Sequence, residues 1–79
     1  MSKQLYVETN LFENRLKNSG YKIDYITDEL GLSRQGFAKK RKGITPFKAS
    51  EVFTLCVLLG ITADDREKIF YPKVEEEVD

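Results

Sequence analysis

Glycine residues divide this 79-residue chain into short segments, and the apolar residues within each segment recur at helical spacing. Glycine often ends a helix because it adopts a left-handed backbone conformation without a steric penalty. We therefore predict helices that stop before Gly20, Gly31, Gly43 and Gly60. Their ranges are about 10–19, 21–30, 33–42 and 49–59, and a fifth helix over about 62–70 is closed by Tyr71 and Pro72.

Three of these helices begin with N-cap signals, in which a small polar side chain accepts a hydrogen bond from a free backbone amide. Asn10 is followed three residues later by Glu13, and Thr62 by Asp65, as in a capping box. Ser33 stands before the third helix. The predicted starts and stops therefore agree with each other along the chain.

The pattern predicts an all-α fold, with a compact five-helix domain over residues 1–72 and a mobile acidic tail over 73–79. Helices this short are marginal alone in water, so they must share one core. Residues 1–9 offer one alternation of apolar residues, at Leu5 and Val7, which is too brief to predict a strand. The residues expected in the core are Leu11, Leu16, Ile23, Ile26, Leu30, Leu32, Phe37, Val52, Leu55, Cys56, Leu59, Ile61 and Ile69.

Charge is distributed unevenly, although 13 basic and 13 acidic side chains give a formal net charge of zero. Residues 33–48 contain no acidic side chain and six basic ones, namely Arg34, Lys39, Lys40, Arg41, Lys42 and Lys48. The rest of the chain has seven basic and thirteen acidic side chains, a net charge of −6. A basic segment is either a solvated helix face or a surface for nucleic acid, and the element that carries it decides between the two.

The basic segment includes the second half of a helix-turn-helix pattern over residues 23–43. Gly31 ends one predicted helix, Leu32 fills the corner, and Ser33 caps the next helix, so that two helices join through a short turn. Ile26, Leu30 and Phe37 are spaced to pack where the helices cross, and Thr27 is small at that crossing. In such a motif the N-terminal end of the second helix enters the major groove of DNA.

Together these residues resemble the lambda-repressor-like, Cro/repressor (XRE-type) family of short phage and bacterial regulators. The resemblance covers about residues 11–70 and includes Ile26-Thr27, Glu29-Leu30-Gly31-Leu32-Ser33, Gly43, and Glu51-Val52 through Leu59-Gly60-Ile61. It implies a DNA-binding domain that represses transcription by occupying an operator.

Two residues depart from that family's pattern. Ile23 stands where the family usually has a polar residue that contacts phosphate. Lys40 stands where many members have an apolar residue. Either the apolar side of this helix is narrower than in those members, or the aliphatic part of the lysine packs on the core while its charge stays in water.

The predicted roles follow from side-chain chemistry and from position along the second helix. Gln35 suits a bidentate pair with adenine, and Arg34 or Lys39 suits guanine O6 and N7, so these three are expected to contact bases. Four residues are expected to hold phosphates, namely Ser33, Lys40, Lys42 and Lys48. Gly36 lies inside a helix at a cost of roughly 1 kcal/mol relative to alanine, which close approach to DNA or tight packing on the preceding helix would explain.

The fourth predicted helix is apolar on more than one face. If Val52, Leu55 and Leu59 face the core, further apolar side chains lie to the side or outside. We expect these to form a partner surface, made of Phe53, Val57, Leu58, Phe70 and Tyr71. A two-fold homodimer through that surface would place two recognition helices one DNA turn apart on a palindromic site.

Two functions therefore compete. The first is a sequence-specific DNA-binding regulator whose partner is a double-stranded operator. The alternative is a helix-turn-helix-fold modulator, antirepressor or antitoxin-like protein that acts mainly on a partner protein such as a repressor, which the zero net charge, the acidic C-terminal residues and Ile23 favour.

Catalysis is not expected, because the chain has no histidine and its one cysteine, Cys56, lies in an apolar helix. We expect no cofactor and no metal site, since a single cysteine cannot supply a cluster. The longest apolar stretch, residues 55–61, is far shorter than the roughly 20 residues of a membrane helix. We accordingly expect a protein of the bacterial host cytoplasm without membrane contact.

Overall fold

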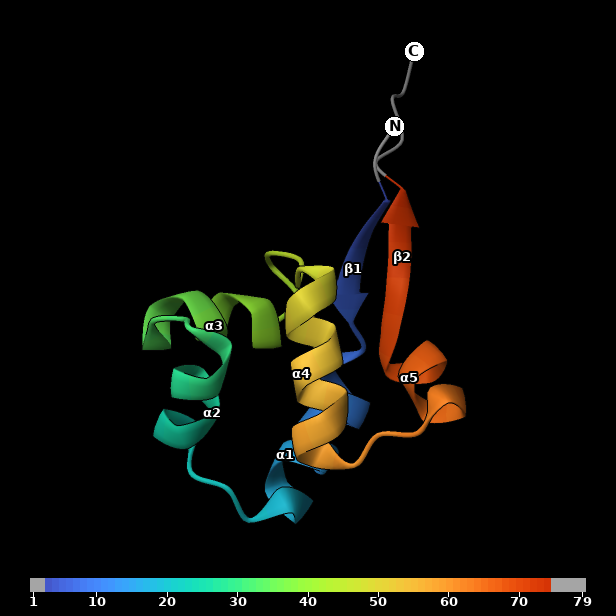
Figure 1. The fold of residues 1–79 in the computed structure, drawn as a ribbon. Helices are drawn as coiled ribbons and strands as arrows, with labels where there is room; N and C mark the ends of the chain where they lie inside the picture. The colour runs from blue at the N-terminus through green and yellow to red at the C-terminus, as the bar shows by residue number, and fades with distance from the viewer. Residues whose placement is uncertain (1–2, 75–79) are drawn as a thin grey trace.

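Five helices and a two-stranded sheet make up residues 3–74, which are the residues that the computed structural model describes (Figure 1). In chain order the elements are β1 (Lys3–Val7), α1 (Thr9–Ser19), α2 (Ile23–Leu30), α3 (Arg34–Arg41), α4 (Ala49–Leu59), α5 (Ala63–Ile69) and β2 (Phe70–Val74). The five predicted helices are confirmed and the fold is mostly helical, but it also has a small two-stranded sheet that the expected all-α fold did not include. No helix among the described residues is long and apolar enough to cross a membrane.

The predicted helix stops are also confirmed. Gly20, Gly31, Gly43 and Gly60 all have positive φ angles, between 66° and 78°. The N-caps agree in part: the Ser33 hydroxyl accepts a hydrogen bond from the Gly36 amide at 3.0 Å, and the Thr62 hydroxyl accepts one from the Asp65 amide at 3.2 Å.

Asn10 is not a cap, because α1 begins one residue earlier, at Thr9. The cap of α1 is Glu8, whose carboxylate accepts hydrogen bonds from the amides of Asn10 and Leu11. A longer acidic side chain thus does the work that the sequence pattern assigned to Asn10.

The strands β1 and β2 are antiparallel and pair from Lys3 with Val74 to Val7 with Phe70. Sequence periodicity missed them because each strand finds its partner at the opposite end of the described chain. Lys73 and Val74 therefore belong to β2 rather than to an acidic tail, and the remainder of the predicted tail, 75–79, lies outside the described residues.

The sheet also tolerates a proline. The Leu5 carbonyl accepts a hydrogen bond from the Phe47 amide at 2.8 Å, on the side of β1 away from β2. Leu5 therefore does not exchange backbone hydrogen bonds with its partner Pro72. The amide hydrogen that Pro72 lacks would have pointed to the outer edge of β2, where no strand needs it.

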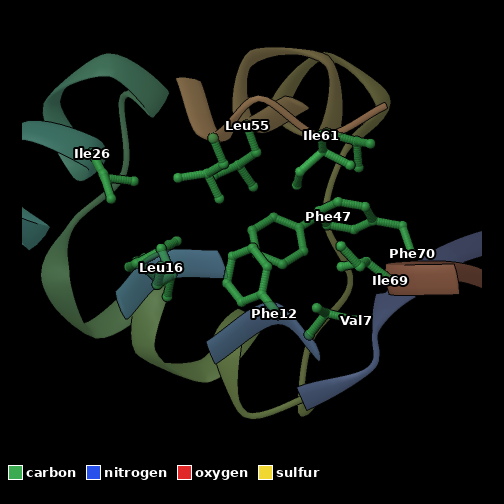
Figure 2. Packing of buried hydrophobic residues seen from close by; sticks show 12 residues of the cluster. Val7, Phe12, Leu16, Ile26, Phe47, Leu55, Ile61, Ile69 and Phe70 are labelled. Carbon is green, nitrogen blue, oxygen red and sulfur yellow. The ribbon is translucent and has the colours of Figure 1, made fainter. Parts of the chain in front are cut away.

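Four phenylalanines from distant parts of the chain form the centre of the core, and Figure 2 labels three of them, Phe12, Phe47 and Phe70. Phe12 of α1 is fully buried, and its ring centroid lies 5.7 Å from Phe47, 5.8 Å from Phe70 and 6.3 Å from Phe37. The contacts with Phe37 and Phe70 are edge-on, an arrangement that the charge distribution of aromatic rings favours. The core thus joins α1, α3, the loop before α4 and the first residue of β2.

The core list from the sequence is confirmed at eight buried positions, namely Leu16, Ile26, Phe37, Val52, Leu55, Leu59, Ile61 and Ile69. Four more are partly buried and pack against the cluster, namely Ile23, Leu30, Leu32 and Cys56. The prediction that Leu11 is in the core is wrong, since Leu11 is 39% exposed. The list also omitted Val7, Phe12, Phe47 and Phe70.

Candidate nucleic-acid interface

The turn between α2 and α3 is built around Gly31, which has φ 70° and ψ 30°. Its amide donates to the Asp28 carbonyl at 3.2 Å, and the Leu32 amide donates to the Thr27 carbonyl at 3.0 Å. These two bonds satisfy carbonyls at the end of α2 and turn the chain sharply into α3. Thr27 is buried, and its hydroxyl donates to the Asp24 carbonyl at 3.0 Å.

Helix α3 buries one apolar side chain, Phe37, and exposes the opposite side. At 3.6 residues per turn, four exposed side chains fall within an arc of about 140° that does not include Phe37. We call this set the α3 basic face; it consists of Arg34, Gln35, Lys39 and Lys42. Ala38 lies within the same arc and is half-buried. The three residues predicted to contact bases are therefore exposed together on one side of one helix.

Of the two interpretations offered from sequence for Gly36, tight packing on α2 is wrong, and close approach to DNA stays a prediction. A Cβ atom there would lie 3.1 Å from the Ser33 hydroxyl oxygen, and it would meet no atom of α2 within 4 Å. The glycine therefore leaves room for the N-cap of its own helix.

Three of the six basic residues between 33 and 48 form ion pairs, and each pair joins α3 to a different helix. Arg34 Nε lies 2.7 Å from Asp24 Oδ1 on α2. Arg41 makes two contacts with Glu13 on α1, Nη2 to Oε1 at 2.7 Å and Nε to Oε2 at 3.1 Å.

The third pair corrects the prediction that Lys40 holds a phosphate. Lys40 Nζ lies 2.7 Å from Glu51 Oε1 on α4, and the two side chains are only 13% and 7% exposed. The cause is helical geometry, because Lys40 follows Phe37 by three residues and so shares its inward side. The Lys40 charge is thus directed into the protein, not into water as one sequence interpretation had it.

The remaining three basic residues are exposed, and none of them forms an ion pair within residues 3–74. They are Lys39, Lys42 and Lys48. Arg34 is available as well, since its pair with Asp24 is 72% and 68% exposed and such pairs contribute about 0–1 kcal/mol. The positive charge that a ligand meets is therefore smaller than the sequence count of six.

Sequence reasoning missed the acidic partners of α3, although one of them carries a recognisable signal. Glu51 is the single acidic residue in α4, a helix that is otherwise apolar or small, and it is 6% exposed. A carboxylate buried on such a helix requires a charged partner. Glu13 and Asp24 lie on solvated faces and carry no comparable signal.

The partner surface predicted on α4 is present in part. Phe53 and Val57 are 71% and 66% exposed, and Tyr71 of β2 is 41% exposed. Leu58 is half-buried and packs against the core, so it contributes less to this surface than predicted. The prediction that Phe70 belongs to this surface is wrong, since Phe70 is only 4% exposed. Helix α5 ends at Ile69, and the Phe70 ring packs against Phe12 and Phe47 in the core.

A groove of about 390 Å³ runs beside this surface, between α4, α5 and the sheet, and its lining includes Phe53, Cys56, Arg66 and Glu67. Burial raises the pKa of the Cys56 thiol above 9.0, and the nearby Arg66 guanidinium partly opposes that shift. A thiol of raised pKa is a poor nucleophile at neutral pH. No cluster of three or more potential metal ligands occurs within residues 3–74.

Comparisons of this chain with models of protein families, with curated proteins and with solved structures found no match.

Proposed function

We propose that this protein is a sequence-specific DNA-binding regulator that occupies an operator by inserting α3 into the major groove. The observation that carries the proposal is the α3 basic face: Arg34 and Gln35 in the first turn and Lys39 one turn later are exposed together on a helix that follows a tight glycine turn. A helix-turn-helix presents its second helix to DNA in this way. The α2–turn–α3 arrangement within a five-helix domain is also what a lambda-repressor-like fold would require.

Within this proposal, Gln35 pairs with adenine, while Arg34 or Lys39 pairs with guanine. Lys42, Lys48 and Ser33 contact phosphates and set the position of the helix along the duplex. Arg34 leaves Asp24 when it binds a base, at small cost because both side chains are exposed. Lys40 has no part in the contact, since it is paired with Glu51 inside the protein.

A homodimer extends the proposal. Phe53 and Val57 present apolar surface on α4, on a helix separate from α3. A two-fold contact there would give two copies of α3 for two half-sites of a palindrome.

The second candidate is a modulator of the same fold that acts on a partner protein such as a repressor. The exposure of Phe53 and Val57 favours it, because exposed apolar surface marks contact sites whatever the partner is. The zero net charge points the same way, since it gives no long-range attraction to DNA.

A titration of labelled random-sequence duplex at low salt, followed by fluorescence anisotropy, separates the two. A DNA regulator binds with roughly micromolar affinity. Arg34→Ala and Lys39→Ala weaken that binding, whereas Lys17→Ala on the exposed side of α1 serves as the matched control and leaves it nearly unchanged. Absence of binding by the unmodified protein would contradict the proposal and favour the partner-protein function.

A further inference from the structure

The buried ion pair between α3 and α4 is unusual because the other buried side chains of the described residues, apart from the Thr27 hydroxyl, are apolar. Of the basic side chains within residues 33–48 that form ion pairs, Lys40 is the least exposed, at 13%. The Glu51 side chain is 7% exposed and is directed at Lys40 from the first turn of α4. Both charges have been removed from water, which costs several kcal/mol per ion before their attraction repays it.

Glu51 binds a backbone amide as well as the Lys40 side chain. Its Oε1 atom accepts from Lys40 Nζ at 2.7 Å and also from the Lys48 backbone amide at 2.8 Å. Lys40 Nζ additionally lies 5.8 Å from the centre of the Phe47 ring. One carboxylate therefore joins the last turn of α3, the end of the loop over 42–48 and the start of α4.

Stability alone does not account for this pair. Apolar side chains of similar volume in place of a buried ion pair are often neutral or stabilising. An apolar contact can form in many relative orientations of two helices, whereas a charged hydrogen bond forms only within a narrow range of distances and angles. An apolar replacement therefore does not fix the orientation of α3. The pair suits a requirement that α3 keep one orientation.

We infer that Lys40 and Glu51 are positioning residues, which fix the orientation of α3 and of the loop over 42–48 on α4 so that the α3 basic face is presented in a single register. This inference rests on the proposed DNA-binding function. Base contacts in the major groove require hydrogen-bond distances to several atoms at once, whereas phosphate contacts tolerate displacement. Loss of the pair therefore reduces discrimination between sequences and leaves the electrostatic contribution to binding intact.

The test uses the full chain with both charges replaced, Lys40→Met together with Glu51→Leu. The double variant avoids the uncompensated buried charge that either single variant would leave, so it is expected to fold. Lys42→Met, a substitution of an exposed lysine one residue past α3, is the matched control.

The first measurement is amide hydrogen exchange in the absence of DNA. In the double variant we expect exchange to become roughly tenfold faster in α3 and in residues 42–48, with α1 and α5 as internal references. Unchanged protection throughout would overturn the inference whether or not the protein binds DNA.

The second measurement compares affinity for a selected site with affinity for random duplex across a salt series. We expect the ratio of the two to fall roughly tenfold in the double variant, while the salt slope stays as in the unmodified protein. Lys42→Met should behave in the opposite way, reducing the slope by about 0.9 and keeping the ratio. A reduced slope with an unchanged ratio in the double variant would identify Lys40 as a phosphate contact and overturn the inference. If the unmodified protein binds no DNA, the proposed function fails, and hydrogen exchange alone decides the positioning role.

Discussion

Helices α3 and α4 lie against the same core but are held there in different ways. In Figure 1, α4 stands between the α2–α3 pair on one side and α5 with the sheet on the other. It buries Val52, Leu55 and Leu59 and still exposes Phe53 and Val57. Helix α3 buries a single apolar side chain, Phe37, and it is joined to α1, α2 and α4 by ion pairs.

This difference separates two demands on a small domain. Because α3 relies on one ring and a few charges, most of its surface is available for side chains that serve a ligand. Because α4 is apolar on more than one side, it holds the core and leaves apolar surface for a partner. The substitutions below test how far the two helices differ, beginning with the largest expected effect.

Replacing one phenylalanine in each helix gives the sharpest contrast. Phe37→Ala removes the single apolar anchor of α3 and should lower the free energy of unfolding by about 3–5 kcal/mol. Phe53→Ala removes a side chain that is 71% exposed and should change it by less than about 0.5 kcal/mol. Urea denaturation followed by circular dichroism measures both, and similar losses for the two would contradict the assignment of Phe37 as the anchor.

The turn before α3 should be sensitive to a side chain, whereas the interior of α3 should not. Gly31→Ala forces a left-handed conformation on alanine and should cost about 1–2 kcal/mol. Gly36→Ala gains helix propensity but brings its Cβ to 3.1 Å from the Ser33 hydroxyl, so the net change should stay within about 1 kcal/mol of zero. Thermal unfolding of the two variants distinguishes them, and a larger loss at Gly36 would indicate that α3 packs more tightly than described.

The exposed side of α4 should govern association rather than stability. Phe53→Asp places a charge where two copies are proposed to meet, and should shift sedimentation toward the monomer while the free energy of unfolding changes by less than about 1 kcal/mol. Glu67→Gln, on neighbouring α5, is a control of small perturbation. A protein that sediments as a monomer at tens of micromolar, with and without DNA, would contradict the dimer.

The smallest effect concerns Cys56, beside the same surface. Its pKa is raised in the folded protein, so the folded state holds the thiol proton more tightly than the unfolded chain does. The contribution to stability is complete below the unfolded value near 9.0 and is lost as the pH rises through the higher folded value. Alkylation should therefore be slower than that of a free thiol at pH 8 and should accelerate in urea. Equal rates in native buffer and in urea would contradict the burial.

Sequence periodicity was sufficient for the helices, since α1 to α4 each have a glycine stop, and α3 and α5 each have a polar cap. It did not predict the sheet, because Leu5 and Val7 alternate only briefly and their partners lie more than 60 residues away. Pairing over such a distance depends on the tertiary fold rather than on local pattern.

Of the candidate site, exposure of Arg34, Gln35 and Lys39 followed from helical geometry with Phe37 fixed inside. The inward direction of Lys40 did not, because a lysine is normally solvated unless an acid is buried opposite it. Glu51 is that acid, and it lies on a helix whose packing against α3 the sequence did not specify. Contacts between helices decide which charged side chains are free to face a ligand and which are used to hold the helices together.

Selection of bound sequences from a random duplex pool tests the central claim most directly. If α3 contacts bases from two copies of the protein, successive rounds enrich a palindrome whose half-sites lie about 10 base pairs apart. Arg34→Ala or Gln35→Ala should relax that consensus at one position of each half-site. Recovery of no consensus, together with unchanged binding by Arg34→Ala and Lys39→Ala, would contradict the operator-binding account.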